Sequence, residues 1–264
     1  MTAVDAAQVG CALSFDVTAP AELVLQIAAV AATGPSLAVS PASTVATLPD
    51  GQQVLRAAPG RLTISYSAAV APAADGSTAG QTVAEVDRIV ALRPSRYCPS
   101  DRLAGFTARE FGGHPDPVRT VRAITDWVHA HLSYQPGSSG PATDAVDTLL
   151  AGAGVCRDYA HLVATLCRAA DIPARVAAVY APGLSPMDFH LVVETALDGR
   201  WRVWDATRLA PRPTLIRVAT GRDAADTALV TTLSGVAVMT EMQVVAVAAG
   251  DLPLDDHTGL VSLA

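Results

Sequence analysis

One cysteine in this sequence has the surroundings of a nucleophile. Cys156 follows the small residues GAGV (152–155) and opens the stretch CRDYAHLVATLCRAA, in which Leu162, Val163 and Leu166 recur at helical spacing. A thiol at the start of a helix lies at the positive end of the helix dipole, beside free backbone N–H groups. Both favour the thiolate, and the N–H groups can hold a developing oxyanion. We therefore predict that Cys156 is a catalytic thiol.

The same predicted helix carries a second cysteine for comparison. Cys167 lies in mid-helix among apolar neighbours, about 16 Å from Cys156 at roughly 1.5 Å per residue, so the two cannot form a disulfide. A cysteine in an apolar helix is most often a core residue, and we assign Cys167 to packing. Asp158, in the first turn, is expected to compensate the helix dipole, and its nearness to Cys156 leaves a positional role open.

A nucleophilic thiol needs a base, and His190 is the best candidate. The segments DFHLVVE (188–194) and RWRVWD (200–205) are joined by Asp198-Gly199, a typical two-residue hairpin loop. With these loop residues, opposed residues have numbers that sum to 397, and His190 and Asp205 become diagonal neighbours on one face of the hairpin. Diagonal pairs lie roughly 7 Å apart at the backbone, within reach of an imidazole and a carboxylate.

These three residues together predict acyl chemistry. Cys156 would attack an acyl carbon, and His190 would take the thiol proton and later deliver one to the leaving group. Asp205 would fix the tautomer and the orientation of the imidazole. The sequence contains no asparagine, so a Cys-His-Asn triad is impossible and a carboxylate must complete the site.

The remaining histidines do not predict a metal site. His129 and His131 are two residues apart on a predicted helix and therefore point to different faces. His161 follows on the nucleophile's helix, where a structural hydrogen bond is favoured over a role in shaping the pocket. His114 and His257 lie in loop-like sequence. We expect no metal and no cofactor.

Composition limits the chemistry and the partners. The 264 residues include 18 basic ones, all of them arginine, so Schiff-base or P-loop lysine mechanisms and self-crosslinking through lysine are excluded. The formal net charge is −7 and the arginines are scattered, which argues against a nucleic-acid partner. The low charge content and ample apolar material predict a folded globular protein.

The sequence also predicts the compartment. Residues 1–10 lack a basic segment followed by an apolar one, and no apolar run reaches the roughly 20 residues that cross a bilayer. The cysteines are unevenly spaced and form no CxxC pair, so we expect separate thiols in a cytoplasmic protein without membrane contact. They are Cys11, Cys98, Cys156 and Cys167.

Strand-like and helix-like patterns divide the chain into two parts. Residues 10–71 alternate short apolar segments with Gly and Pro turns, which predicts a small β-sandwich-like domain, and residues 71–81 form a loop at its edge. Helical spacing follows over 116–132 and from Cys156 to Pro173, and strand-like segments come after it. We predict an α+β protein with a β-rich domain at 1–95 and a catalytic core at 96–264 that includes the last strands.

Three segments, GVCRDYAHL, DFHLVVE and GRWRVWDATRLAP, together resemble the motif blocks of the bacterial transglutaminase-like superfamily. The tail TGRDAADTALVTTL and the strand-rich N-terminal part also resemble members of that superfamily. The resemblance implies a papain-like core in which helices pack on an antiparallel sheet. It also implies that Cys156, His190 and Asp205 are the catalytic residues.

Membership in this superfamily does not select a reaction, because hydrolases, acyl transferases, cyclases and inactive scaffolds share the fold. We favour hydrolysis of a peptide or amide, or acyl transfer to an amine, on a peptide, protein or small-molecule acyl substrate. One alternative is acyl transfer or cyclisation on a thioester-bound small molecule. Another, of a different class, is a non-catalytic interaction module that kept the fold. The sequence does not predict the oligomeric state.

Overall fold

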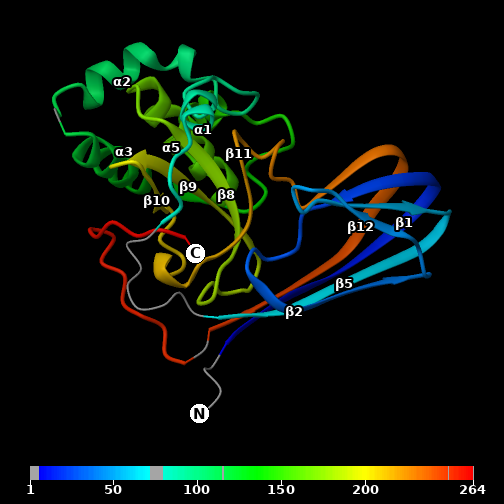
Figure 1. The fold of residues 1–264 in the computed structure, drawn as a ribbon. Coiled ribbons are helices and arrows are strands. Elements are labelled where there is room, and N and C mark those ends of the chain that lie inside the picture. Colours follow the sequence, from blue (N-terminus) through cyan, green and yellow to red (C-terminus); the bar gives the residue numbers. More distant parts are fainter. Residues whose placement is uncertain (1–5, 72–79, 115, 249, 264) are drawn as a thin grey trace.

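The structure, a computed structural model, describes residues 6–71, 80–114, 116–248 and 250–263. It has two parts: a long antiparallel sheet, and a core in which helices cover one face of a shorter antiparallel sheet (Figure 1). The predicted α+β class, with helices packed on an antiparallel sheet, is confirmed. The loop expected at 71–81 falls largely outside the described residues.

The long sheet has the order β2-β5-β1-β4-β3, and β12 pairs with the other side of β1. Its strands are β1 (Ala7–Leu25), β2 (Ala32–Ser40), β3 (Val45–Thr47), β4 (Gln53–Ala57), β5 (Gly60–Val70) and β12 (Val230–Val247). The central strand β1 pairs with β5 along its first half and with β4 along its second half. Its side chains alternate between buried and exposed, as expected for a sheet with one apolar face.

This sheet curls where β1 bends. The pairing of β1 with β12 shifts register between Val17 and Leu23, around Pro20. Opposite the bend, Gly235 has a φ of +76°, and a Cβ on it would lie 2.0 Å from the Pro20 carbonyl oxygen, so only glycine fits there. The curl closes the apolar face on itself, and side chains such as Leu13 and Leu55 are almost completely buried.

The core contains five helices, two short 3₁₀ turns and six strands among the described residues. The helices and turns are α1 (Glu85–Val90), η1 (Ser100–Arg102), α2 (Ala104–Phe111), α3 (Pro117–His131), α4 (Ala145–Ala151), α5 (Cys156–Ala169) and η2 (Arg212–Thr214). Strands β8 (Ala174–Tyr180), β9 (Phe189–Leu197), β10 (Arg200–Trp204) and β11 (Ile216–Gly221) form a sheet in the order β10-β9-β8-β11. Strands β6 (Ser133–Tyr134) and β7 (Ala153–Gly154) form a separate parallel pair.

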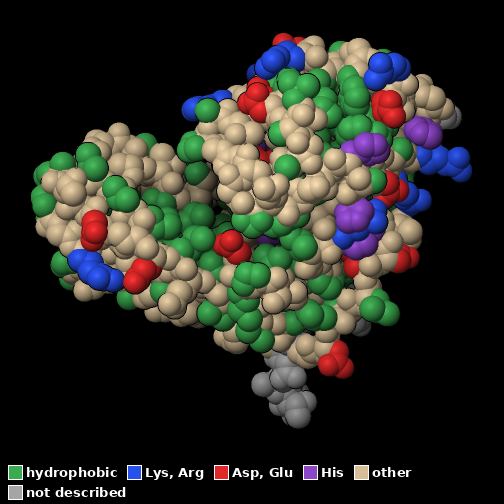
Figure 2. All heavy atoms as spheres, turned by 180° about the vertical axis from the view of Figure 1, so that it is seen from behind, with side chains coloured by type: hydrophobic (Ala, Val, Ile, Leu, Met, Phe, Trp, Pro, Cys, Tyr) green, Lys and Arg blue, Asp and Glu red, His purple; other side chains and the backbone are tan. Residues whose placement is uncertain are grey.

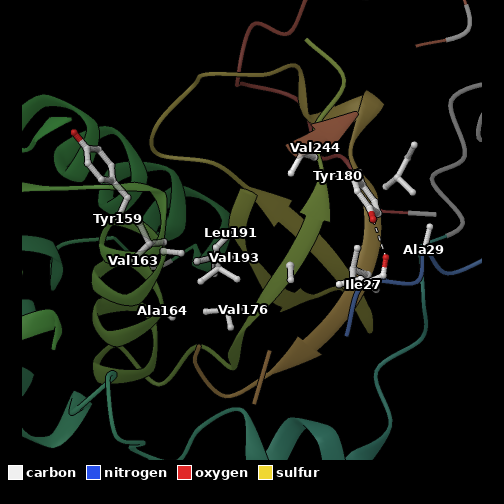
Figure 3. Packing of buried hydrophobic residues seen from close by; sticks show 14 of the residues in the cluster. Ile27, Ala29, Tyr159, Val163, Ala164, Val176, Tyr180, Leu191, Val193 and Val244 are labelled. Carbon is white, nitrogen blue, oxygen red and sulfur yellow. Dashed lines mark hydrogen bonds between the residues drawn. The ribbon is translucent and has the colours of Figure 1, made fainter. Parts of the chain in front are cut away.

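Helix α5 packs against β8 and β9. Val163 and Ala164 point from the helix toward Val176, Leu191 and Val193 on the sheet (Figure 3), and all five are buried. The predicted helices over 116–132 and from Cys156 are confirmed, as α3 and α5. No helix within the described ranges has the length and apolar content to cross a membrane.

The two parts share a continuous apolar interior. The Tyr180 hydroxyl, at the end of β8, donates to the main-chain oxygen of Ile27 at 2.8 Å (Figure 3). Its ring stacks on that of Tyr66 from the long sheet, with centroids 6.5 Å apart. Nearby, the backbone N–H of Ala29 donates to the Tyr66 hydroxyl at 3.0 Å. These contacts hold the curled sheet against the open side of the core.

One part of the predicted organisation needs correction. The segment that forms β12 was expected in the catalytic core, but it pairs with β1 in the N-terminal sheet. The apolar alternation of β12 identifies a strand without identifying its neighbour, since the pairing partner lies more than 200 residues away. The chain thus leaves the first sheet, builds the core and returns. The boundary at residues 95 and 96 itself stays a prediction.

Candidate active site

Cys156 is the first residue of α5, with Val155 as the N-cap. The Asp158 carboxylate reaches back to accept the Val155 N–H at 2.8 Å, and Asp158 is completely buried. Gly154 makes room for it: a Cβ on this glycine would lie 2.6 Å from the Asp158 Cβ. The sequence GVCRD thus builds the first helical turn and leaves Cys156 only partly buried, at the positive end of the helix dipole.

The predicted hairpin register is confirmed. Asp198 and Gly199 have φ values of +51° and +71°, as a two-residue hairpin loop of type I′ requires, and β9 pairs with β10 from Leu197 opposite Arg200 onward. Asp205 directly follows β10. The His190 Nε2 and the Asp205 Oδ2 are 2.8 Å apart, and both side chains are buried.

The charges of this pair stabilise each other. Burial disfavours a charged imidazole, but the Asp205 carboxylate outweighs it and raises the pKa of His190 to about 10. Burial likewise opposes the charged Asp205, yet the His190 imidazolium and two hydrogen bonds from Thr207 lower the pKa of this carboxyl. The Thr207 N–H and hydroxyl donate to Asp205 Oδ1 at 2.9 and 2.7 Å. Asp205 is therefore held in one orientation toward the imidazole.

The structure brings Cys156 to this pair. Its thiol lies close enough to hydrogen-bond the His190 imidazole and adds to the rise in the pKa of His190. Because Nε2 faces Asp205, Nδ1 is the nitrogen left for the sulfur. Burial raises the pKa of the other three thiols, to about 11 for Cys11 and Cys98 and to about 12 for Cys167. Of the four, Cys156 alone is not fully buried.

Tyr134 is a neighbour of the candidate thiol that sequence reasoning missed. Strand β6 pairs with β7 directly before Cys156, with Tyr134 opposite Gly154. The Tyr134 hydroxyl is close enough to hydrogen-bond both the backbone N–H and the thiol of Cys156, and burial together with this sulfur raises the pKa of Tyr134 to about 12. It is thus a neutral donor near neutral pH. A two-residue strand leaves no periodic signal in the sequence, so only the fold could reveal this contact.

Hydrogen bonds with Asp158 and Arg157 fix the loop that follows Tyr134. Asp158 also accepts the Ser139 hydroxyl at 2.5 Å and Arg157 Nε at 3.2 Å. Arg157 in turn donates to the Ser139 hydroxyl and the Gly140 carbonyl, each at 3.0 Å. The positional role left open for Asp158 therefore has a structural basis, since this carboxylate joins the helix start to the neighbouring loop.

The other histidines have structural contacts. His161 Nε2 accepts the backbone N–H of Ala224 at 3.0 Å, and burial lowers the pKa of His161 to about 4, which confirms the expected structural hydrogen bond. His129 Nδ1 lies 2.8 Å from the Ala206 oxygen, and His131 stacks on Trp127. Among the described residues no cluster of three His, Cys, Asp or Glu side chains could hold a metal ion.

Comparison with known proteins shows the family and the fold. The sequence profile of the transglutaminase-like superfamily matches residues 105–206. The crystal structure of a candidate cysteine protease from Cytophaga hutchinsonii is 33% identical, covers 96% of this chain and 94% of its own, and superposes with a TM-score of 0.85. An uncharacterized protein from Mycobacterium leprae is 30% identical over 125 residues, which are 47% of this chain and 43% of that protein.

Proposed function

This chain belongs to the transglutaminase-like superfamily, and we propose that it is a thiol enzyme that forms an acyl-enzyme on Cys156. The observation that carries the proposal is the buried pair of His190 and Asp205, 2.8 Å apart, in contact with the partly exposed thiol at the start of α5. A buried acid and base beside a nucleophile are the parts that acyl transfer needs.

The first half-reaction starts from an ion pair between the Cys156 thiolate and the His190 imidazolium. The Cys156 sulfur attacks the acyl carbon, a C–S bond forms, and the electron pair of the carbonyl moves onto oxygen. The Cys156 N–H and the Tyr134 hydroxyl donate to this oxyanion. The intermediate collapses when the bond to the leaving group breaks and the His190 imidazolium gives its proton to that group.

The second half-reaction regenerates the thiolate. His190 takes a proton from water or an amine as that nucleophile attacks the thioester carbon. The C–S bond then breaks, the sulfur leaves as thiolate and the imidazolium is restored. Asp205 stays ionised throughout and stabilises the charged imidazole.

We favour a peptide or another amide as the acyl donor and water as the acceptor, with acyl transfer to an amine as the second outcome of the same intermediate. Water is present at every turnover, and the chain has no lysine that could serve as its own acceptor. No metal or cofactor has a step in this mechanism.

The proposed partners and compartment follow from composition and surface. On the face shown in Figure 2, arginine and acidic side chains are interspersed, which supports the proposal that nucleic acid is not a partner. All four cysteines are free thiols, which supports the proposed cytoplasmic location because reducing compartments keep thiols unpaired. Fractionation of cells that express the protein tests this location.

Mass spectrometry of the intact protein tests the reaction. We would incubate the enzyme with a library of peptides, amides and small thioesters and search for an acyl adduct on Cys156. Cys156→Ala should lose both adduct and turnover and keep its fold, whereas Cys167→Ala should keep both. Equal turnover by the wild type and Cys156→Ala would remove the mechanism.

A further inference from the structure

The segment 251–263, which we call the strap, reaches β10, the outermost strand of the core sheet, at residues 261 and 262. The Val203 N–H donates to the Val261 oxygen at 2.8 Å, and the two residues form a β-bridge. The Ser262 hydroxyl donates to the Trp201 oxygen at 2.9 Å. Residues beyond 206 lie outside the match to the superfamily profile, yet the strap covers the strand that leads directly to Asp205.

A buried ion pair anchors the strap. The Arg212 Nε and Nη2 donate to the two oxygens of the Asp255 carboxylate, each at 2.8 Å, and the Arg212 N–H adds a third bond at 2.9 Å. The side chains are 1% and 5% exposed. Burial opposes the charge, but these bonds hold the pKa of Asp255 far below its usual value. A charge-assisted pair with this burial is a strong attachment.

The same arginine also holds β10. Its Nη1 donates to the Val203 oxygen at 3.3 Å and to the Gly259 oxygen at 3.2 Å. Its guanidinium carbon lies 5.9 Å from the centre of the Trp204 ring. Arg212 therefore connects the strap to the two residues that come immediately before Asp205.

Water has no room beside Asp205 on the side that faces the strap. His257 and Arg212 on this side, with Arg122 and Asp126 from α3, line a small gap at Asp205 that has no room for a water molecule. His257 is near enough for the Asp205 charge to act on it, although burial dominates and lowers the pKa of His257. These are the charged and titratable groups that line this gap beside Asp205.

We propose that Asp255 is a positioning residue for the catalytic carboxylate. Through its ion pair with Arg212 it fixes the strap on β10. The strap in turn keeps water away from Asp205 and orients this carboxylate toward His190. The inference rests on the proposed function, because Asp255 would support the site at which that function takes place.

Residues 81–83 bond the outer edge of β10 only at its start, around Arg200 and Trp201, so without the strap the end next to Asp205 would lose its outer backbone bond. Water at Asp205 would then weaken its pull on the imidazole. A small displacement of Asp205 is enough, because an error near 1 Å can cost a rate on the order of 100-fold.

The test compares two aspartates with the same bonding pattern. Asp226 accepts the N–H and Nε of Arg222 on Oδ2 at 2.9 and 2.8 Å and its Nη2 on Oδ1 at 3.1 Å, but this pair is 51% and 32% exposed. Asp255→Asn thus removes a buried Arg–Asp ion pair, and Asp226→Asn removes an exposed one with the same hydrogen-bonding pattern. The readout is the pH profile of Cys156 alkylation by iodoacetamide in the full chain.

In Asp255→Asn we expect the alkylation rate at pH 6 to fall between about 10- and 100-fold and the acid limb to move to higher pH, because His190 loses part of its support. Asp226→Asn should overlay the wild type, and Asp255→Glu should recover part of the rate. A purely structural role would lower the melting temperature and leave the profile of the folded protein unchanged, and that result overturns the inference.

Two controls keep the outcomes distinct. If the wild type itself reacts no faster at pH 6 than His190→Ala, the proposed function fails and the inference fails with it. If Asp255→Asn does not fold, His257→Gln decides, because it keeps the Arg212–Asp255 ion pair and changes a side chain that lies between Asp255, 3.5 Å away, and the gap at Asp205. A displaced profile then supports the inference, and an overlaid one overturns it.

Discussion

Alkylation of Cys156 in His190→Ala is the most direct measure of the proposed ion pair. The substitution removes the imidazole that contacts the thiol and leaves α5 and its N–H groups in place. Because the pKa of His190 is about 10, the imidazole in the wild type is charged at pH 6, and a positive charge at this position favours the thiolate. Without it, Cys156 should react as an ordinary thiol at a helix start.

The magnitude follows from thiolate fractions. A thiol with the usual pKa of about 8.5 is roughly 0.3% thiolate at pH 6, so full activation by the imidazolium can raise the rate by at most roughly 300-fold. We expect His190→Ala to lower the alkylation rate at pH 6 by about 100-fold. Above pH 9 the two rates should converge, since even an ordinary thiol is then ionised.

The assay is mass spectrometry of peptides after timed exposure to iodoacetamide at several pH values. Cys167 serves within each sample as a reference: with a pKa of about 12 and no exposed surface, it should label at least roughly 1,000-fold more slowly than Cys156. His131→Ala removes an exposed histidine outside the site and should match the wild type. A rate for His190→Ala within threefold of the wild type at pH 6 would refute the ion pair.

Further predictions concern the surrounding residues. Asp205→Ala should lower turnover but leave a measurable residual activity, because the carboxylate orients His190 without transferring the proton. Steady-state kinetics check this. Tyr134→Phe keeps the ring and should lower kcat by about 10- to 100-fold if its hydroxyl serves the oxyanion, whereas an unchanged kcat excludes it. Gly154→Ala meets the Asp158 Cβ at 2.6 Å and should cost about 1–3 kcal/mol in urea unfolding. The raised pKa of His190 means that its pairing with Asp205 stabilises the fold fully below pH 6.5 and that this stabilisation is lost as the pH rises toward 10. The lowered pKa of Asp205 means that the stabilisation from its carboxylate is lost on acidification below pH 3.8. Unfolding midpoints across pH, compared with those of Asp205→Ala, measure both effects.

The local parts of the site could be predicted because short-range rules govern them. A two-residue Asp-Gly loop fixes which residues oppose each other, so the register that brings His190 to Asp205 follows from the numbering of one hairpin. The position of Cys156 at a helix start follows from the glycines before it and the apolar spacing after it. Their catalytic roles remain proposals that the alkylation and adduct experiments test.

The long-range parts could not be predicted, because they join segments far apart in the sequence. The pattern of β12 is that of a strand, but pairing with β1 is selected by packing across the whole fold. Tyr134 reaches Cys156 through a two-residue strand pair that has no periodicity. The partnership of Arg212 with Asp255 spans 43 residues and gives no local signal.

The sequence by itself determined the place of Cys156 at a helix start, the hairpin that brings His190 to Asp205, and, in a chain without asparagine, that a carboxylate must be the third member of the proposed triad. Each depends on residues close together along the chain, where backbone geometry leaves few choices. The tertiary structure alone decided that the hairpin meets the helix start, that Asp205 is sealed from water, and that the last long strand returns to the first sheet. These features depend on which apolar faces pack together, and burial, unlike local geometry, is a property of the whole fold.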